Sequence, residues 1–360
     1  MTKVADLLAE LVRLPTQQGG PAGVERAFCE HLAPMLRARG AERVEIGEGK
    51  RTDGSPGAWI FATWGTPRRV VNAHIDTVPA NAGWSRPPWQ PAIEGGKLYG
   101  LGSADTKGAI AATLVALDDT RPKNFGALFS GDEEAGSRIL TQFLETPPEL
   151  HGIREVIVCE PTRRVAGVAH RGVLAQQATL TGPGGHSSLA DHLPKPLAKL
   201  ARLAVALDDS AARRVDDGPP GMTGTCLNLG ALAGGIAFNV IAARAELEWS
   251  LRPYPGFDRA GWEREVAALV AALDPAIALT TLIDHPPFAA RAESALPALV
   301  APFADSVGPL HFWTEAALYA LHGIDAVVIG PGDIAQAHAA DEWVALDDLD
   351  WAVELLRAAM

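Results

Sequence analysis

Three adjacent carboxylates follow an apolar run in the segment LFSGDEEAG, residues 128–136. Asp132, Glu133 and Glu134 repel one another, because two unit charges about 4 Å apart cost roughly 1 kcal/mol in water and about 4 kcal/mol near a protein surface. A solvated turn is the ordinary interpretation of such a charge run. The alternative is a site in which a bound cation offsets the repulsion.

Other acidic residues and histidines occur at or near the ends of predicted strands. His74 and Asp76 lie two residues apart in RRVVNAHID, so both side chains point to one face of a strand. Asp105 is the last residue of the glycine-rich YGLGSAD and opens a predicted helix, whereas Glu160 and His338 lie in REVIVCEP and AHAADEW. Each residue alone has an ordinary structural interpretation: a core histidine, a helix N-cap, a surface turn or a loop position.

Taken together, these residues are a ligand set for divalent metal ions. Histidine, aspartate and glutamate supply nitrogen and oxygen donors without thiolates, which suits zinc or a similar ion. If one carboxylate bridges two ions, and each ion also receives one histidine and one carboxylate, the ions lie about 3.5–4 Å apart. Such ions would neutralise the repulsion within the acidic triplet. One glutamate of the triplet could then bind metal while its neighbour remains free as a base.

The elements that must position these residues follow a regular order in the first 160 residues. Predicted helices cover residues 3–14, 22–39, 107–119 and 137–145, and short apolar runs between and after them are predicted strands. This alternation predicts a mostly parallel sheet with helices on both faces. Ligands of such sheets gather at the carboxyl ends of the strands, which is where the candidate residues lie.

Between residues 172 and 283 the predicted order changes to β-α-β-β-α-β, the ferredoxin-like pattern of a small α+β domain. Residues 294–360 resume the alternation and end in the helix LDDLDWAVELLRAAM. We therefore predict the fold class α/β, with a mostly parallel-sheet domain formed by residues 1–171 and 284–360. An inserted α+β domain at residues 172–283 interrupts it.

Composition excludes several classes of protein. The 360 residues predict two domains, and a formal charge of −12 argues against nucleic acid or an anionic membrane as partner. Cys29, Cys159 and Cys226 are too far apart for a disulfide framework or a CxxC zinc knuckle, which is typical of the reducing cytoplasm. The amphipathic pattern of residues 1–16 differs from a signal peptide, and no apolar run approaches the roughly 20 residues of a membrane span.

The order, spacing and flanks of the motifs resemble those of the dinuclear zinc amidohydrolases, a family that includes acetylornithine deacetylase, succinyl-diaminopimelate desuccinylase and glutamate carboxypeptidases. The resemblance runs along the full chain and covers HIDTVP, GLGSADTKGAI, DEEAG, CEP and AHAADEW. It implies two divalent ions, Zn²⁺ first and Co²⁺ as the alternative. The implied ligands are His74, Asp105 and Glu160 on one ion, and Asp105, Glu134 and His338 on the other. Glu133 is then the general base, and Asp76 is the neighbour of His74 outside the ligand set.

The inserted domain carries further motifs of the same family. GPGGHSS resembles a lid loop whose histidine, here His186, helps to stabilise the oxyanion and comes from the partner subunit in dimeric members. FNVIAARAELEWSLRP contains Asn239 and Arg252, which match residues that contact substrate or transition state, and Arg252 is the expected carboxylate clamp. Arg171 in HRGV matches a further arginine on the substrate side. The resemblance thus implies a lid and dimerisation domain and a homodimer.

The segment WTEAALYALHGIDAVVIGPGDIAQAHAADEWV resembles the acetylornithine deacetylase branch, and especially the acetylcitrulline deacetylases. Desuccinylases more often show a GGTSD-like segment there. Glu315 is therefore a candidate specificity residue, with a buried helix carboxylate that has a local partner as the alternative. The chain departs from the family at Leu101, Thr106 and Ser250, where relatives usually have Arg, Met and an acidic residue. These positions concern packing around the ligands rather than the ligands themselves.

The resemblance implies metal-dependent hydrolysis of a small N-acetyl-L-amino acid, acetylcitrulline or acetylornithine, in arginine biosynthesis in the cytoplasm. The alternatives are a desuccinylase, a carboxypeptidase or dipeptidase of the same family, and a non-catalytic binding protein on the same fold. A serine hydrolase is disfavoured because the chain has no GxSxG motif. A nucleotide-binding protein is disfavoured because GLGSAD has Asp105 where a third glycine belongs, and no Walker loop occurs.

Overall fold

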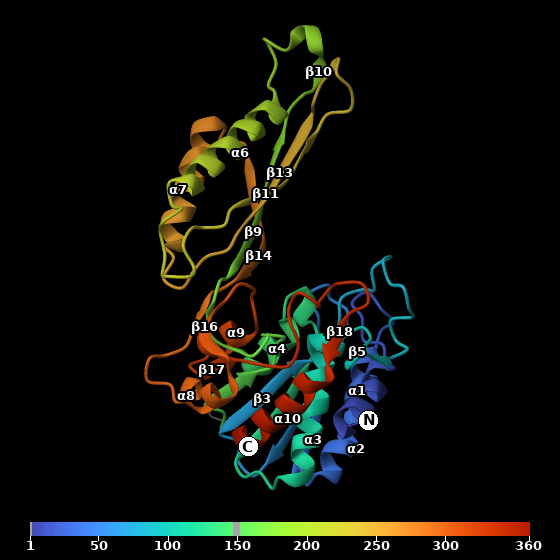
Figure 1. Cartoon of the computed structure of the whole chain (residues 1–360). Helices are drawn as coiled ribbons and strands as arrows, with labels where there is room; N and C mark the ends of the chain where they lie inside the picture. The colour runs from blue at the N-terminus through green and yellow to red at the C-terminus, as the bar shows by residue number, and fades with distance from the viewer. Residues whose placement is uncertain (1, 147–151) are drawn as a thin grey trace. The chain divides into compact units, whose positions relative to one another are not determined.

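The computed structural model describes residues 2–146 and 152–360, and the chain forms two compact units (Figure 1). The first unit consists of Met1–Val168, Ala289–Leu310 and Thr314–Met360. The second consists of Ala169–Phe288 and His311–Trp313, so it contains the whole segment in which the sequence predicts an insertion. No helix of the described residues is long and apolar enough to cross a membrane.

A single large sheet organises the first unit. Its strand order is β1(Arg43–Lys50), β2(Pro56–Trp64), β6(Phe125–Ser130), β3(Arg69–His74), β7(Glu155–Val158), β17(Asp325–Val328), β8(Val165–His170) and β15(Phe288–Ala289), with β16(Ser306–Leu310) paired to β8. The four central strands, from β6 to β17, pair in parallel, whereas β1 and β2 pair antiparallel with their neighbours and β8 pairs antiparallel with β17. Every residue of β6 and β7 is buried, as expected for parallel strands that are covered on both faces.

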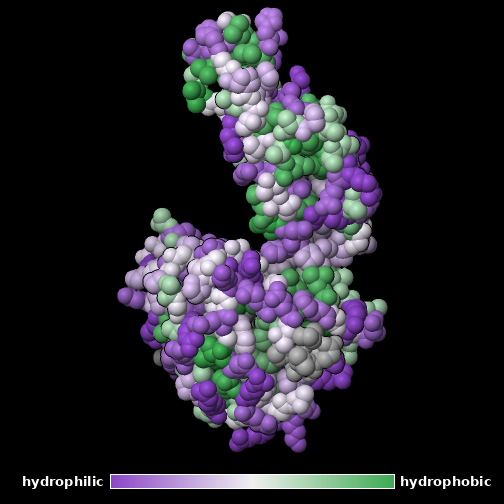
Figure 2. Space-filling view, turned by 180° about the vertical axis from the view of Figure 1, so that it is seen from behind, coloured by the Kyte–Doolittle hydropathy of each residue, from purple (hydrophilic) through white to green (hydrophobic). Residues whose placement is uncertain are grey.

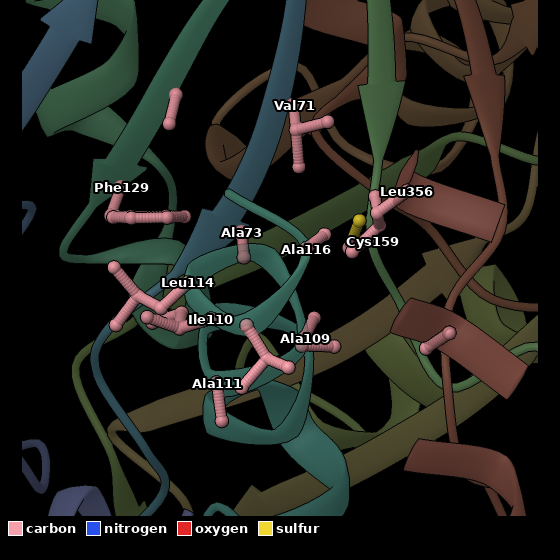
Figure 3. Packing of buried hydrophobic residues seen from close by; sticks show 14 of the residues in the cluster. Val71, Ala73, Ala109, Ile110, Ala111, Leu114, Ala116, Phe129, Cys159 and Leu356 are labelled. Carbon is pink, nitrogen blue, oxygen red and sulfur yellow. The ribbon is translucent and has the colours of Figure 1, made fainter. Parts of the chain in front are cut away.

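Helices cover both faces of this sheet. The core on one face joins α1(Lys3–Val12), α2(Val24–Ala38), α3(Gly108–Asp119), α8(Leu296–Val300) and α10(Leu346–Ala359) to the sheet. Side chains of α3 pack there against Ala73 of β3 and Phe129 of β6 (Figure 3). On the other face, the ring of Phe143 in α4(Arg138–Leu144) lies 5.4 Å from that of Phe61, whereas the preceding residue Ile60 points to the opposite face and belongs to the first core. The predicted α/β class is therefore confirmed.

The strands of this sheet that are absent from the sequence prediction include β1 and β8. The segment RVEIGEGK of β1 contains four charged residues and two glycines and is half-exposed at the edge of the sheet. The segment VAGVAH of β8 is short and contains a glycine that lies against Leu310 and Val328. Both strands form because neighbouring strands supply their hydrogen-bond partners, which local pattern does not reveal.

Near the carboxyl ends of the parallel strands, a small sheet joins distant parts of the chain. Its order is β18(Trp343–Ala345), β5(Lys97–Tyr99) and β4(Ala92–Glu94), with Trp343 opposite Tyr99. This pairing places the chain after residue 99, including the short π-helical turn η1(Ser103–Lys107), beside the loop that precedes β18. Two candidate ligand segments are thereby brought together.

The second unit is an antiparallel sheet with helices on one face. The strand order is β11(Asn228–Gly234), β13(Arg244–Leu251), β9(Val173–Thr181) and β14(Ala278–His285). Its core joins the sheet to α6(Pro196–Ala212) and α7(Arg259–Leu273), with Trp249 and Trp262 almost completely buried. A short ladder of β10(Gly185–His186) with β12(Val240–Ile241) and the turn η3(Ser187–Leu189) complete the unit. Along the chain the main elements follow the predicted order β-α-β-β-α-β.

Candidate metal centre

The candidate ligands of the first unit gather at the carboxyl ends of its central strands. His74 is the last residue of β3 and lies opposite Ser130, the last residue of β6. On the other side of β3, the amide of Cys159 donates to the carbonyl of Asn72 at 2.8 Å, which aligns the residues after β7 with the end of β3. His74, the turn after β6 and Glu160 therefore share one edge of the sheet.

Two groups of potential ligand atoms meet at this edge. His74, Asp105 and Glu160 form one group, and Asp105, Glu134 and His338 form the other, with the ligand atoms of each group within 4.8 Å of one another. Nε2 of His74 lies 2.9 Å from Oδ1 of Asp105, whereas Nε2 of His338 lies 3.4 Å from Oδ2. Asp105 thus turns one oxygen to each group, and the groups are the two sets that the family resemblance implies.

Asp105 does not act as a helix N-cap. It lies inside η1 with φ −122° and ψ 87°, and the residue that caps α3 is Lys107, which makes no side-chain capping bond. The peptide bond between Asp105 and Thr106 is cis. The hydroxyl of Thr106 donates to the carbonyl of His74 at 2.8 Å, which links the turn directly to the end of β3.

Buried negative charge dominates the electrostatics of the site. Burial raises the pKa of Glu160 well above its ordinary value, and burial together with the charge of Asp105 raises the pKa of Glu134. Hydrogen bonds to Asp105 and Glu134 raise the pKa of His338 to about 10. Burial opposes the charged form of His74, but the bonds to Asp105 and Asp76 carry its pKa well above the ordinary value.

This donor set fits a pair of divalent ions. It contains imidazole nitrogens and carboxylate oxygens without a thiolate, which suits zinc and similar ions. Metal ions replace protons on such ligands and supply the positive charge that these clustered carboxylates otherwise lack. The side chains of Asp105 and Glu134 are only 7% and 6% exposed, so water screens their charges poorly.

Asp76 organises the surroundings of the ligands. Its carbonyl oxygen lies 2.9 Å from Nδ1 of His74, so Nδ1–H can donate there and leave Nε2 for a metal. Its carboxylate accepts the backbone N–H groups of Glu133 and Glu134, each at 3.2 Å, and a bond from the side chain of Gln18. Gln18 carries no sequence signal, because nothing in TQQGG indicates that it will reach the site.

The acidic triplet divides into residues with different surroundings. Asp132 is completely buried and accepts from the amide and hydroxyl of Thr52, at 2.9 and 2.8 Å, and from the amide of Arg138 at 3.0 Å. It therefore anchors the turn η2(Glu133–Ala135) to the loop between β1 and β2, and a solvated turn is the wrong interpretation for this residue. Glu134 belongs to the second ligand group, and Glu133 belongs to neither. Burial and the charge of Glu160 raise the pKa of Glu133 well above its ordinary value.

Glu315 lies buried at the start of α9(Ala316–Leu321), where it is 1% exposed. Its Oε2 accepts from the hydroxyl of Ser130 at 3.4 Å. Burial raises the pKa of Glu315 to about 8, while the charge of His74 opposes that shift. The local partner expected from the alternative interpretation is therefore present, and contact with substrate stays a prediction.

The remaining candidates lie in the second unit. His186 is exposed, and its Nδ1 lies 2.8 Å from the hydroxyl of Ser188. Asn239 is exposed, and its backbone oxygen accepts from Ser187 at 3.0 Å. Arg252 is exposed, and no ion-pair partner of its guanidinium occurs among residues 2–146 and 152–360.

Arg171 differs from Arg252 because it is buried and bound by backbone carbonyls. Its guanidinium donates to the carbonyl oxygens of Thr223 and Gly224, both at 2.7 Å, and of Arg252 at 2.9 Å. These bonds hold the chain at Arg252 against the loop around Gly224. Direct contact of Arg171 with substrate stays a prediction.

The family of the chain follows from its match to known proteins. Residues 70–360 match the model of peptidase family M20/M25/M40. The chain belongs to this family. M20 proteins of the kinds matched here are metallohydrolases of amide bonds, and this chain is an enzyme of that class.

Three individual proteins show how far the similarity extends. An N-acetyl-L-citrulline deacetylase of Xanthomonas campestris pv. campestris is 34% identical, covering 92% of this chain and 89% of the relative. A succinyl-diaminopimelate desuccinylase of Stenotrophomonas maltophilia is 28% identical over 97% and 96% of the two chains. The M20 metallo-carboxypeptidase Sso-CP2 of Sulfolobus solfataricus shares the fold, with a TM-score of 0.80 at 17% identity over 99% and 98% of the chains.

Proposed function

We propose that this M20 enzyme hydrolyses the N-acetyl amide of a small N-acetyl-L-amino acid, with citrulline or ornithine as the amino acid. The observation that carries the proposal is the pair of ligand groups that share Asp105, with Glu133 beside them and outside both. The similarity to a deacetylase of N-acetyl-L-citrulline supports this choice of substrate class. Arginine biosynthesis in the cytoplasm is the proposed setting.

Two zinc ions are the proposed cofactors, with cobalt as the alternative. His74, Asp105 and Glu160 would hold one ion, and Asp105, Glu134 and His338 the other. When bound, such a pair supplies Lewis acidity toward water and toward the amide carbonyl.

Residues of the chain perform the proton transfers and the positioning in this proposal. Glu133 accepts the proton of the attacking water and returns it to the leaving amine. Asp76 orients Glu133 through its backbone amide and fixes the ring of His74. His186 stabilises the negative charge that develops on the carbonyl oxygen. Arg252, whose guanidinium has no internal ion-pair partner in the described chain, binds the α-carboxylate of the substrate.

We also propose a homodimer formed through the second unit, whose surface includes apolar areas (Figure 2). β11 lies at an edge of its sheet, and an unpaired edge strand can pair with a second copy. Apolar side chains on and after it are exposed: Leu229, Leu232, Ile236 and Phe238, of which Phe238 is completely exposed. An apolar edge of this kind is typical of a protein–protein contact. In such a dimer His186 would serve the site of the partner.

The main alternative is another activity of the same family. A desuccinylase or dipeptidase of the same family would use the same ligand groups on a different acyl group. The non-catalytic binding protein that the sequence left open is not supported, because the chain belongs to a family of enzymes and both ligand groups and Glu133 are present.

Turnover on a matched panel tests the proposal. The zinc-loaded protein is assayed for free amine from N-acetyl-L-citrulline, N-acetyl-L-ornithine, N-succinyl-diaminopimelate and a dipeptide. We expect the highest kcat/KM for an acetyl amino acid. Faster cleavage of the succinyl compound or of the dipeptide would transfer the assignment to the corresponding alternative, and no turnover of any of them would contradict the proposed substrate class.

A further inference from the structure

Glu342 is a buried carboxylate that belongs to neither ligand group. It is 2% exposed and accepts three backbone hydrogen bonds from the turn that carries Asp105. Its Oε2 accepts from the amide of Gly102 at 2.9 Å, and its Oε1 accepts from the amides of Ala104 and Asp105 at 2.8 and 3.1 Å. These are the interactions expected of a carboxylate that fixes a backbone rather than one that binds a metal.

The turn needs such a partner for a simple reason. Amides at the start of a helical turn have no partner within the turn, and a buried amide without a partner destabilises the folded protein. Gly102 precedes η1 with φ 80°, a conformation that glycine adopts readily, and its amide points to Glu342. Since the direction of the Asp105 side chain depends on its backbone, an anchor on three amides of residues 102–105 also orients the side chain.

Glu342 also belongs to the loop that carries the other metal-binding histidine. It follows His338 by four positions and directly precedes β18. Its backbone oxygen accepts from the amide of Gly100 at 2.9 Å, next to the pairing of Trp343 with Tyr99. Glu342 is therefore bonded by both backbone and side chain to the segment of Asp105, while its own loop carries His338.

The chemistry of the side chain explains why a carboxylate stands here. Two acceptor oxygens satisfy three N–H donors, whereas the amide of a glutamine offers one acceptor oxygen and an NH₂ group that is a donor. A glutamine would therefore direct a donor at the amide of Gly102 or at those of Ala104 and Asp105. Burial and the charge of Asp105 raise the pKa of Glu342 to about 8, and the three bonds from backbone amides oppose that shift because they favour the ionised carboxylate.

We propose that Glu342 is a positioning residue that holds Asp105 so that its two oxygens remain divided between the two ligand groups. This inference rests on the proposed two-metal site. Glu342 contacts neither metal nor substrate in this proposal. Loss of the hydrogen bonds of Glu342 is expected to lower the affinity of the protein for both ions, because both ions share Asp105 as a ligand.

Zinc affinity measured by competition with a chromophoric chelator tests the inference. We expect Glu342→Gln to weaken binding of both ions by about 10–100-fold, the usual effect of removing a partner that orients a ligand. The matched control is Glu155→Gln. Glu155 is the first residue of β7, at the end of the strand away from the ligands, and its side chain accepts two hydrogen bonds from Arg69; the residue is 9% exposed. The control should lower the thermal unfolding temperature and leave the zinc affinity within a factor of two.

Three outcomes are distinguishable. If the parent enzyme binds no zinc, the proposed two-metal function fails. If the parent binds two ions and folded Glu342→Gln binds them equally tightly, the positioning role alone is wrong. Loss of zinc affinity in the variant, but not in the control, supports it.

A measurement on the parent keeps the inference testable where the variant does not fold. Amide hydrogen exchange of the metal-free parent should show the amides of Gly102, Ala104 and Asp105 exchanging roughly 100-fold more slowly than amides of exposed loops. Exchange of these amides at the rate of exposed loops would show that the Glu342 anchor does not exist in solution, and would overturn the inference.

Discussion

Nε2 of His74 and Oδ1 of Asp105 lie 2.9 Å apart, and both side chains are buried. The other ring nitrogen of His74 is occupied by a backbone carbonyl, so the ring cannot turn away without losing that bond. Asp105 keeps its second oxygen for the opposite group. Asp105 is therefore shared between the two ligand groups, whereas His74 belongs to one of them, and this difference makes the metal content of variants predictable.

We expect His74→Ala and His338→Ala to lose different ions. Each variant should retain about one zinc ion per chain, while Asp105→Ala should lose both, because only Asp105 belongs to both groups. Elemental analysis after zinc reconstitution and gel filtration measures this. Full occupancy in Asp105→Ala, or a parent that never binds more than one ion, would contradict the shared-ligand arrangement.

Glu133→Gln should keep both ions and lose most turnover. The change preserves the shape of the side chain and removes its ability to accept a proton, and general acid–base assistance is worth about 10²–10⁴-fold. Glu134→Gln is the matched comparison on the neighbouring residue and should reduce metal content as well. Near-parental kcat in Glu133→Gln, measured at full zinc occupancy, would assign the base to another group.

The buried Glu25 should make stability depend on pH. Burial, reinforced by the charge of Asp76, raises its pKa from 4.5 to about 7. The folded state therefore binds this proton more tightly than the unfolded state, and the stabilisation present below about pH 4.5 is lost as the pH rises through about 7. Glu25→Gln cannot titrate, so its free energy of unfolding relative to the parent should rise by about 2–3 kcal/mol between pH 5 and pH 8.

Urea unfolding of the two metal-free proteins at both pH values measures this difference, and contributions of other groups cancel between them. Glu25 accepts from the amide of Ala58 at 2.9 Å, a bond that the carbonyl of glutamine can keep. A difference that stays constant or falls with pH would show that Glu25 is already ionised at pH 5 in the folded protein.

Arg252→Ala should lower kcat/KM for N-acetyl-L-citrulline by about 10²-fold or more, because a charge-assisted bond to the substrate carboxylate is lost. Converting that carboxylate to an amide should cost the parent a similar factor. For the Arg252→Ala variant, the amidated substrate should lower kcat/KM little further, because the substitution and the amidation remove the same interaction. If the two changes lower kcat/KM independently, so that their effects multiply, the substrate carboxylate binds to a residue other than Arg252.

Phe238→Asp should convert a dimer into a monomer. The substitution puts a charge on the completely exposed ring that follows the edge strand β11. The control Leu321→Asp alters a side chain of the first unit that is 66% exposed and should leave the mass unchanged. Sedimentation equilibrium measures both. A parent that is monomeric and fully active would exclude a role for His186 in the site of a partner.

Much of the candidate site is predictable from sequence because its residues stand at the ends of recognisable strands. RRVVNAHID, FGALFSGDEE and REVIVCEP are apolar runs of strand length, and each ends in His74, the acidic triplet or Glu160. Parallel pairing then brings the carboxyl ends of β3, β6 and β7 to one edge. The α/β class and the two ligand sets follow from local patterns and the family resemblance, without knowledge of any contact.

Contacts between distant segments are what only the tertiary structure decides. Glu342 and Gly102 are 240 positions apart, and Gln18 and Asp76 are 58 apart. Asp132 resembles Glu133 and Glu134 in sequence, yet Thr52 and Arg138 bind it as an anchor of the turn. Arg171 and Arg252 both match substrate-side arginines of the family in sequence, but backbone carbonyls bind the guanidinium of Arg171. A hydrogen-bond partner is chosen by the packing of whole elements, whereas a strand or helix follows from the periodicity of its own residues.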